Sequence, residues 1–354
     1  MRASNGAAAT ASKVMTTMNP TPSAATPAAA PASLRQKSRA ALREAGIGVA
    51  LVCLTAVFAL LSPIFLTPSN ITNIFTQISI NVILAVGMTF VILIGGIDLS
   101  VGSVMAFCAV VAGTVLKLEG LDTGVAIGLA LLASIAVGAL CGLANGAVSA
   151  YWGIPSFIVT LGMLNIARGA ALQWTQARSL YEFPDAFNDF GSATLLGAPA
   201  IFLVALALVA VGWFVLNRTV FGRLIYAIGN NEEAVRLAGH NVMGYKIAAF
   251  VICGAAVGVG AVIYMTRLTI ASPISGIGFE LNAIAAVIIG GTSLSGGRGS
   301  IVGTLLGACI IGVLANGLIL IGMSDFLRQM VTGFVIILAV VLDVYRARLA
   351  RGST

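Results

Sequence analysis

The stretch "AVGMTFVILIGGIDLSVGS", residues Ala85–Ser103, decides the fold. Its first half is an apolar run of the kind that crosses a bilayer as a helix, and its second half is polar and rich in glycine. Consecutive glycines break or end a membrane helix, and backbone groups freed at that depth are tolerated only where protein or water covers them. The stretch therefore predicts a helix that stops at a covered site inside a membrane protein.

Apolar runs of this kind recur along nearly the whole chain. Hydrophobic residues make up 59% of it and charged residues 9%, against about 45–50% and about 25% in soluble domains. The runs lack the period-two alternation of a membrane barrel. We expect an all-α polytopic membrane protein of about ten transmembrane helices, at roughly 46–66, 71–95, 101–117, 123–150, 155–175, 197–216, 247–271, 280–292, 300–321 and 327–345.

The charges predict the orientation in the membrane. With a cytoplasmic N-terminus, twelve basic residues fall inside and three outside, Lys117, Arg178 and Arg328. The net charge of +7 therefore indicates topology rather than nucleic-acid binding. Residues 1–45 are predicted to be a disordered cytoplasmic tail, residues 46–345 the membrane domain, and residues 346–354 a cytoplasmic C-terminal tail. The localisation expected is the inner membrane of a bacterium, with both termini cytoplasmic.

The polar phrase occurs twice. "IGGIDLSVG", Ile94–Gly102, and "IGGTSLSGG", Ile289–Gly297, are identical at six of nine positions across an offset of 195 residues. We interpret this as an internal repeat in which Asp98 and Ser100 of the first copy, and the Thr and Ser side chains of the second, such as Thr292 and Ser295, bond the freed backbone as caps do. Ten spans put both copies on one membrane side, whereas inverted repeats would put them on opposite sides. Either the repeat is parallel, or one span is miscounted, and the short eighth span is then the candidate.

Small residues indicate how the helices pack. Glycines recur at intervals of four within three spans, as at Gly138 and Gly142 or Gly254 and Gly258. That spacing puts them on one helix face, where backbones can approach closely. The five cysteines lie inside apolar spans without metal-ligand spacing, so we interpret them as packing residues and predict no metal site.

Polar side chains within the spans are the candidates for a translocation pathway. Such groups are costly in lipid and should face a cavity or one another. Amides offer both donors and acceptors, which suits a neutral, hydroxyl-rich cargo. Arg168 and Arg267 fall near outer helix ends, where long side chains reach the interface. The pathway candidates are Asn81, Asp98, Ser100, Asn145, Asn165, Glu280, Asn282 and Asn316.

The long polar loop 217–246 is the candidate for contact with a cytoplasmic partner. Asn230 or Asn231 can cap a short helix whose first turn holds Glu232 and Glu233, and Gly239 can end it in the left-handed conformation. The apolar side of this helix is either part of a surface loop or a docking surface for a partner. The residues proposed for docking are Asn230, Asn231, Glu232, Glu233, Ala234, Leu237 and Gly239.

The chain resembles the permease subunits of ribose-type sugar ABC importers. The resemblance rests on the stretch quoted first, on "GRLIYAIGNNEEAVRLAGHNV" (Gly222–Val242) and on "ELNAIAAVIIGGTSLSGGRGSIVGTLLGA" (Glu280–Ala308). It implies the fold of such permeases, two permease chains per channel, two cytoplasmic ATPase subunits that bind ATP and Mg²⁺, and a periplasmic sugar-binding protein. It also implies an E-A-A-x-x-x-G-like coupling motif, matched at Glu233, Ala234 and Gly239, with Val235 departing from it.

The sequence also indicates that energy comes from elsewhere. No GxxxxGK[ST] phosphate loop is present, and none of the lysines follows a glycine. We expect no enzyme activity and no cofactor in this chain, which would form the translocation pathway of an ATP-driven monosaccharide importer. An ion-coupled secondary transporter, suggested by Asp98 and Glu280, is the alternative. A membrane scaffold is weaker, because intramembrane polar residues occur on several helices.

Overall fold

The computed structural model describes residues 32–351. The chain divides into two units, residues 1–40 and 41–354. The described residues form thirteen helices and one short hairpin. The elements are α1 Ala32–Leu61, α2 Pro68–Leu93, α3 Val101–Leu116, α4 Thr123–Trp152, α5 Ser156–Thr175, α6 Asp185–Ser192, β1 Thr194–Leu195, β2 Ala198–Pro199, α7 Ala200–Arg218, α8 Val220–Asn230, α9 Glu232–Leu237, α10 Val242–Leu268, α11 Phe279–Ile289, α12 Ile301–Leu320 and α13 Asp325–Arg351.

Each of the ten predicted spans corresponds to a helix, which confirms the all-α polytopic fold. Among the described residues, α1, α2, α4, α7, α10 and α12 are long and apolar enough to cross a membrane, and α3 and α11 are shorter apolar helices. α1 begins before residue 46, within the predicted tail, and α13 runs past residue 345. The disorder expected of residues 1–31 lies outside the described residues.

Helix α2 is the centre of the membrane domain. It packs against α7, α10, α11 and α12, and 89% of its most apolar window is buried. The second half of α2 is apolar on all sides, which suits a helix that other helices surround. α2 packs against α11, and each of these two helices leads directly into one copy of the repeated phrase.

The predicted glycine faces are confirmed where α4 packs along α10. A Cβ added at Gly138 would overlap the carbonyl oxygen of Gly254, and one added at Gly254 would overlap that of Gly138. Gly142 lies in the same way against the carbonyl of Phe250. Only hydrogen at these positions lets the backbones come so close, and the loss of side-chain volume is offset by backbone packing.

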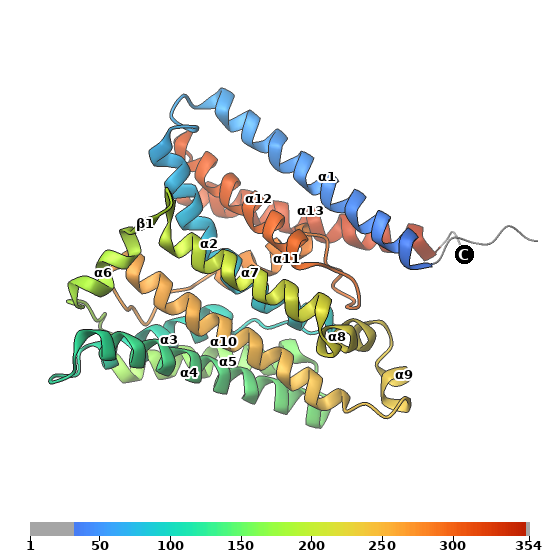
Figure 1. The fold of residues 1–354 in the computed structure, drawn as a ribbon, viewed down its shortest axis with the longest axis horizontal. Coiled ribbons are helices and arrows are strands. Elements are labelled where there is room, and N and C mark those ends of the chain that lie inside the picture. The colour runs from blue at the N-terminus through green and yellow to red at the C-terminus, as the bar shows by residue number, and fades with distance from the viewer. Residues whose placement is uncertain (1–31, 352–354) are drawn as a thin grey trace, which may run out of the picture. The chain divides into compact units, whose positions relative to one another are not determined.

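The connections form two distinct ends. α6 and the hairpin lie at one end of the helices and α8 and α9 at the other (Figure 1). We call these the α6 end and the α9 end. The hairpin turn uses Leu196 at φ 55° and Gly197 at φ 80°. Neither α6 nor α8 was expected from the sequence, because both lie outside the apolar spans.

Candidate functional site

Both copies of the repeated phrase begin with the same helix-ending turn. After α2 the amide of Gly95 donates to the carbonyl of Ile92 and the next amide reaches one residue further back, both at 2.9 Å. After α11 the amide of Gly291 donates to Ile288 at 2.8 Å, and the next amide again reaches one residue further back, at 3.0 Å. Gly95 and Gly291 have φ of 77° and 86°. The prediction that glycine ends both helices is confirmed, with a Schellman turn in each copy.

The two copies touch each other. The amide of Gly297 donates to the carbonyl of Leu93 at 2.8 Å, so the second copy lies directly against the end of α2. The short eighth span is a separate helix, α11, of 11 residues, which is shorter than the about 20 residues that cross a bilayer. The two left-handed glycines, Gly95 and Gly291, stand 196 residues apart, one more than the offset of 195 at which the two sequences match.

A buried polar cluster, Asp98–Ser100–Asn145, lies at the start of α3. Oδ1 of Asp98 accepts the backbone amide of Ser100 at 2.9 Å and its hydroxyl at 2.6 Å. Nδ2 of Asn145, on α4, donates to Ser100 Oγ at 3.0 Å and to Asp98 Oδ2 at 3.5 Å. A carboxylate suits the positive end of the α3 dipole. The expected local bonding is confirmed in this copy, and three of the predicted pathway residues meet.

Helix α5 holds the link between α2 and α3. Ser156 Oγ accepts the amide of Ile97 at 2.9 Å, and Thr160 Oγ1 accepts the amide of Leu99 at 3.1 Å. Backbone groups of the non-helical link are thus paired within the protein, as membrane depth requires. We did not expect Ser156 and Thr160 to belong to the site. Their spacing of four at a helix start is the signal that could have found them.

The second copy is held differently. The hydroxyl of Thr292 is buried and has no hydrogen-bond partner among the described residues. Ser300, three residues beyond the phrase, instead caps α12 by accepting the amide of Gly303 at 2.9 Å, and donates to Glu44 of α1 at 2.6 Å. The expectation that the Thr and Ser side chains of this copy bond the freed backbone is therefore wrong for Thr292. The link needs a cap where α12 starts, and that point lies further along the chain.

Glu280 and Arg168 organise the segment that leads into α11. Oε1 of Glu280 accepts the amide of Gly278 at 3.2 Å, and a Cβ added at Gly102 would overlap its other oxygen. The start of α11 therefore packs against the start of α3. Arg168 donates to the carbonyls of Pro273 and Ser275 at 2.6 and 2.8 Å, so it anchors this segment.

The remaining pathway candidates do not gather at one site. Asn316 is buried and pairs with Asn70, which makes it part of a helix contact. Asn165 lies on an exposed face of α5 and bonds only its own helix, so it does not meet the other candidates within this chain. Oδ1 of Asn81 is buried without a partner among the described residues. Asn282 is half-buried in the first turn of α11, and Arg267 ends α10 as expected.

The loop 217–246 contains the predicted capped helix. Asn231 accepts the amide of Ala234 at 3.0 Å and starts α9. Gly239 ends it at φ 83°. Glu233 pairs with Arg236. Of the predicted apolar edge, Leu237 is 79% exposed whereas Val235 is buried. The loop also contains α8, which the sequence analysis missed although Leu224, Ile225 and Ile228 give it a buried face.

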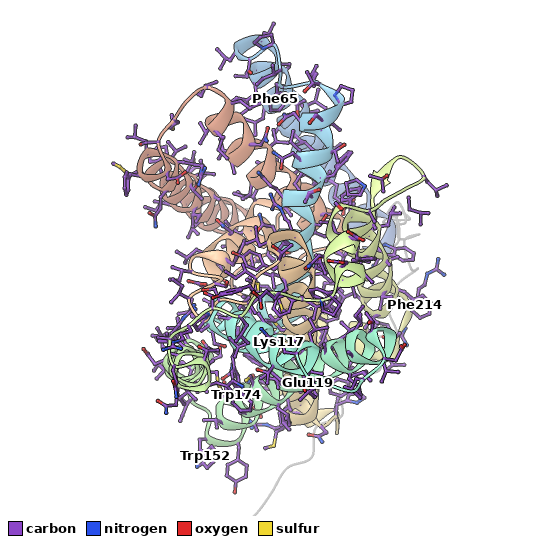
Figure 2. The ribbon with its side chains drawn as sticks, turned by 90° about the vertical axis from the view of Figure 1, so that its left-hand side faces the viewer. Phe65, Lys117, Glu119, Trp152, Trp174 and Phe214 are labelled. Atoms are coloured by element: carbon purple, nitrogen blue, oxygen red, sulfur yellow. The ribbon has the colours of Figure 1, made fainter. Side chains whose placement is uncertain are left out.

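A recess of about 560 Å³ opens at the α6 end. Lys117 reaches the carbonyl of Tyr181 at 3.0 Å and the carboxylate of Glu182 at 4.0 Å. Trp174 donates to the hydroxyl of Thr114 at 3.1 Å. Figure 2 views this end, with Lys117 and Trp174 labelled in its lower half. Charged and aromatic side chains therefore share one exposed surface there.

The described residues form no group of three or more His, Cys, Asp or Glu that could hold a metal ion. All five cysteines are free. Four of them are buried or half-buried in helix contacts, as the packing interpretation predicts, and Cys53 is exposed on α1.

Comparison with known proteins identifies the family. A family model described as "Branched-chain amino acid transport system / permease component" matches residues 70–340. The chain belongs to this permease family. The permease is 42% identical to the ribose import permease protein RbsC of Escherichia coli K12, over 87% of its own length and 96% of that protein. No solved structure matches the permease.

Two further relatives give the same picture. The permease is 39% identical to the D-allose transport system permease protein AlsC of Escherichia coli K12, over 83% of its own length and 89% of that protein. It is 35% identical to the L-arabinose ABC transporter permease protein AraH of Azospirillum brasilense, over 93% and 94%. These matches confirm the resemblance to ribose-type sugar ABC permeases. The chain is thus a multi-pass membrane transport subunit, which is not an enzyme in itself.

Proposed function

We propose that this permease forms the translocation pathway for a monosaccharide in an ATP-driven importer. The observation that carries the proposal is the similarity, over more than four fifths of the chain, to permeases named for ribose, allose and arabinose. The family description names branched-chain amino acids instead. The Asp98–Ser100–Asn145 cluster favours the sugar, because hydroxyls and amides that donate and accept match a neutral polyol.

A separate ATPase subunit would bind ATP and Mg²⁺ and dock on α9. α9 presents the exposed Leu237 beside the acidic Glu232 and Glu233. A short helix that ends in an exposed leucine fits a groove on a partner. The chain carries no phosphate loop of its own, so hydrolysis belongs to that partner.

A periplasmic sugar-binding protein would dock at the α6 end. The basic residues that flank the spans favour a cytoplasmic α9 end and an external α6 end. This orientation, with both termini cytoplasmic in a bacterial inner membrane, is part of the proposal. The recess is lined by Lys117, Arg178 and Glu182. Charges of both signs there can fix the orientation of a docked soluble protein.

A second copy of the permease, or a relative, would cover the exposed face of α5. Asn165 and Ile166 lie on that face, and a polar amide in contact with lipid is costly. Gly162 and Gly169 would meet nothing within 4 Å if a Cβ were added, which leaves room for another helix to approach. The pathway would then run between two copies.

Reconstitution tests the proposal. Proteoliposomes that contain the permease, its ATPase and its binding protein should take up radiolabelled ribose, allose or arabinose only with internal ATP. Uptake that continues without the ATPase would overturn it. Collapse of the proton and sodium gradients separates the ion-coupled alternative, because only that transporter would stop. Uptake of leucine in place of all three sugars would assign the substrate suggested by the family description.

A further inference from the structure

The C-terminal end of α8 is inserted between the two copies of the repeated phrase. A Cβ added at Gly229 would overlap both the carbonyl oxygen of Leu93 and the amide nitrogen of Gly297. The same two groups form the hydrogen bond that joins the copies. One glycine therefore contacts the end of α2 and the α11–α12 link at the point where they meet.

Side chains of α8 fix this contact, which we call the α8 joint: Tyr226, Gly229 and Asn230 with Leu93 and the link 290–300. Asn230 Nδ2 donates to the backbone carbonyl of Gly297 at 3.2 Å. The hydroxyl of Tyr226 donates to the backbone carbonyl of Gly299 at 3.0 Å. Burial raises the pKa of Tyr226 to about 12, so its hydroxyl stays protonated and keeps donating over the whole physiological range.

The joint is connected to α9 without slack. Asn231 is the only residue between α8 and α9; its amide donates to Ala227 at 2.9 Å and its side chain caps α9. Glu232, the first residue of α9, pairs with Lys246 of α10 at 2.9 Å. The side chain of Val235 is buried on the inner side of α9. A displacement of α9 must therefore move α8, because no flexible segment separates the two helices.

We propose that the α8 joint transmits movement of α9 to the ends of α2 and α11 together, and that Gly229 and Asn230 are its positioning residues. This inference rests on the proposed function, since the movement would come from the docked ATPase. The ends of α2 and α11 carry the two helix breaks. The first of these leads directly into the Asp98–Ser100–Asn145 cluster, so displacement at the joint would reach the candidate pathway.

The test compares Gly229→Ala with Gly48→Ala, a helical glycine of α1 that has open space around it. In the reconstituted complex, Gly229→Ala should lower sugar uptake per ATP hydrolysed by at least about fivefold, the lower end of usual coupling energies. Tyr226→Phe removes one hydrogen bond and should lower the ratio about threefold. Gly48→Ala should leave it unchanged. Co-purification of the ATPase should persist in all variants.

A labelling experiment keeps the proposal falsifiable if Gly229→Ala lowers expression. Ser295→Cys places an exposed thiol on the link, in a background that lacks the five native cysteines. Its labelling rate in the complex should change when ATP is added and should stop changing with Asn230→Ala. An ATP response that persists with Asn230→Ala, or normal coupling in Gly229→Ala, would overturn the joint. Loss of ATPase binding in the variants would also overturn it, in favour of a docking role. Failure of the unmodified complex to use ATP for uptake would instead refute the proposed function.

Discussion

Asn316 is predicted to stabilise the fold rather than to contact the transported solute. Its amide and that of Asn70 exchange two hydrogen bonds at 3.0 Å between α12 and α2, 246 residues apart. Asn316 is 1% exposed. Asn70 also donates to the carbonyl of Phe65 at 2.8 Å. The pair therefore joins the α1–α2 corner to the far end of α12.

The cost of breaking the pair follows from these bonds. Hydrogen bonds between membrane helices contribute about 0.6 kcal/mol on average and about 1.7 kcal/mol at most. Asn316→Leu removes two and should lower the free energy of unfolding by about 1–3 kcal/mol. Asn70→Leu removes three and should cost about 1 kcal/mol more, because the Phe65 carbonyl also loses its partner.

The double variant gives the sharper result. With both amides replaced, only the Phe65 carbonyl remains unpaired. The double variant should therefore lose less free energy of unfolding than Asn70→Leu alone. The expected interaction energy is about 2 kcal/mol. Asn217→Leu is the control, because that exposed amide bonds only its own helix turn. It should change stability by less than about 0.5 kcal/mol.

Equilibrium unfolding in detergent micelles measures these stabilities, and uptake by the reconstituted complex measures transport. Transport by the double variant should recover together with its stability. Additive costs in the double variant would refute the reciprocal pair. A stable Asn316→Leu protein without uptake would return Asn316 to the translocation pathway.

Three further predictions concern other contacts. Gly254→Ala should destabilise the permease by about 1–3 kcal/mol through overlap with α4, whereas Gly128→Ala, which has open space, should not; unfolding of both checks this. Asp98→Asn should reduce uptake severalfold and cost only about 1 kcal/mol of stability, because one of its two oxygens still accepts from Ser100; normal uptake would remove Asp98 from the pathway. Gly239→Ala must adopt φ 83° and should cost about 1 kcal/mol, loosening α9 and lowering uptake per ATP without loss of membrane insertion; unchanged coupling in transport assays would contradict this.

Local features of the fold could be read from the sequence because their causes are local. Apolar length predicted the ten helices, and glycine after an apolar run predicted the turns at Gly95 and Gly291. Asn231 and Gly239 bounded α9 as expected. α8 was missed because its whole segment was assigned to the loop 217–246. Its apolar residues Leu224, Ile225 and Ile228 nevertheless recur at helical spacing.

The candidate site could be predicted only in part. Asp98 and Ser100 are two residues apart, so their bond is visible in the sequence. Nothing local indicates that Asn145 completes the cluster or that Asn316 pairs with Asn70. A polar residue in an apolar span shows that a partner is needed, but the identity of that partner depends on how the helices pack.

The sequence by itself determined the membrane class, the helix spans, the helix-ending glycines and the capped helix α9, since apolar length, φ preference and capping act within a few residues. Only the tertiary structure decided that the two copies of the phrase touch through Leu93 and Gly297, that α8 ends between them at Gly229, and which amides pair across helices. Those contacts join segments up to 246 residues apart. They arise from the packing of glycine faces and the pairing of buried polar groups, which no single segment specifies.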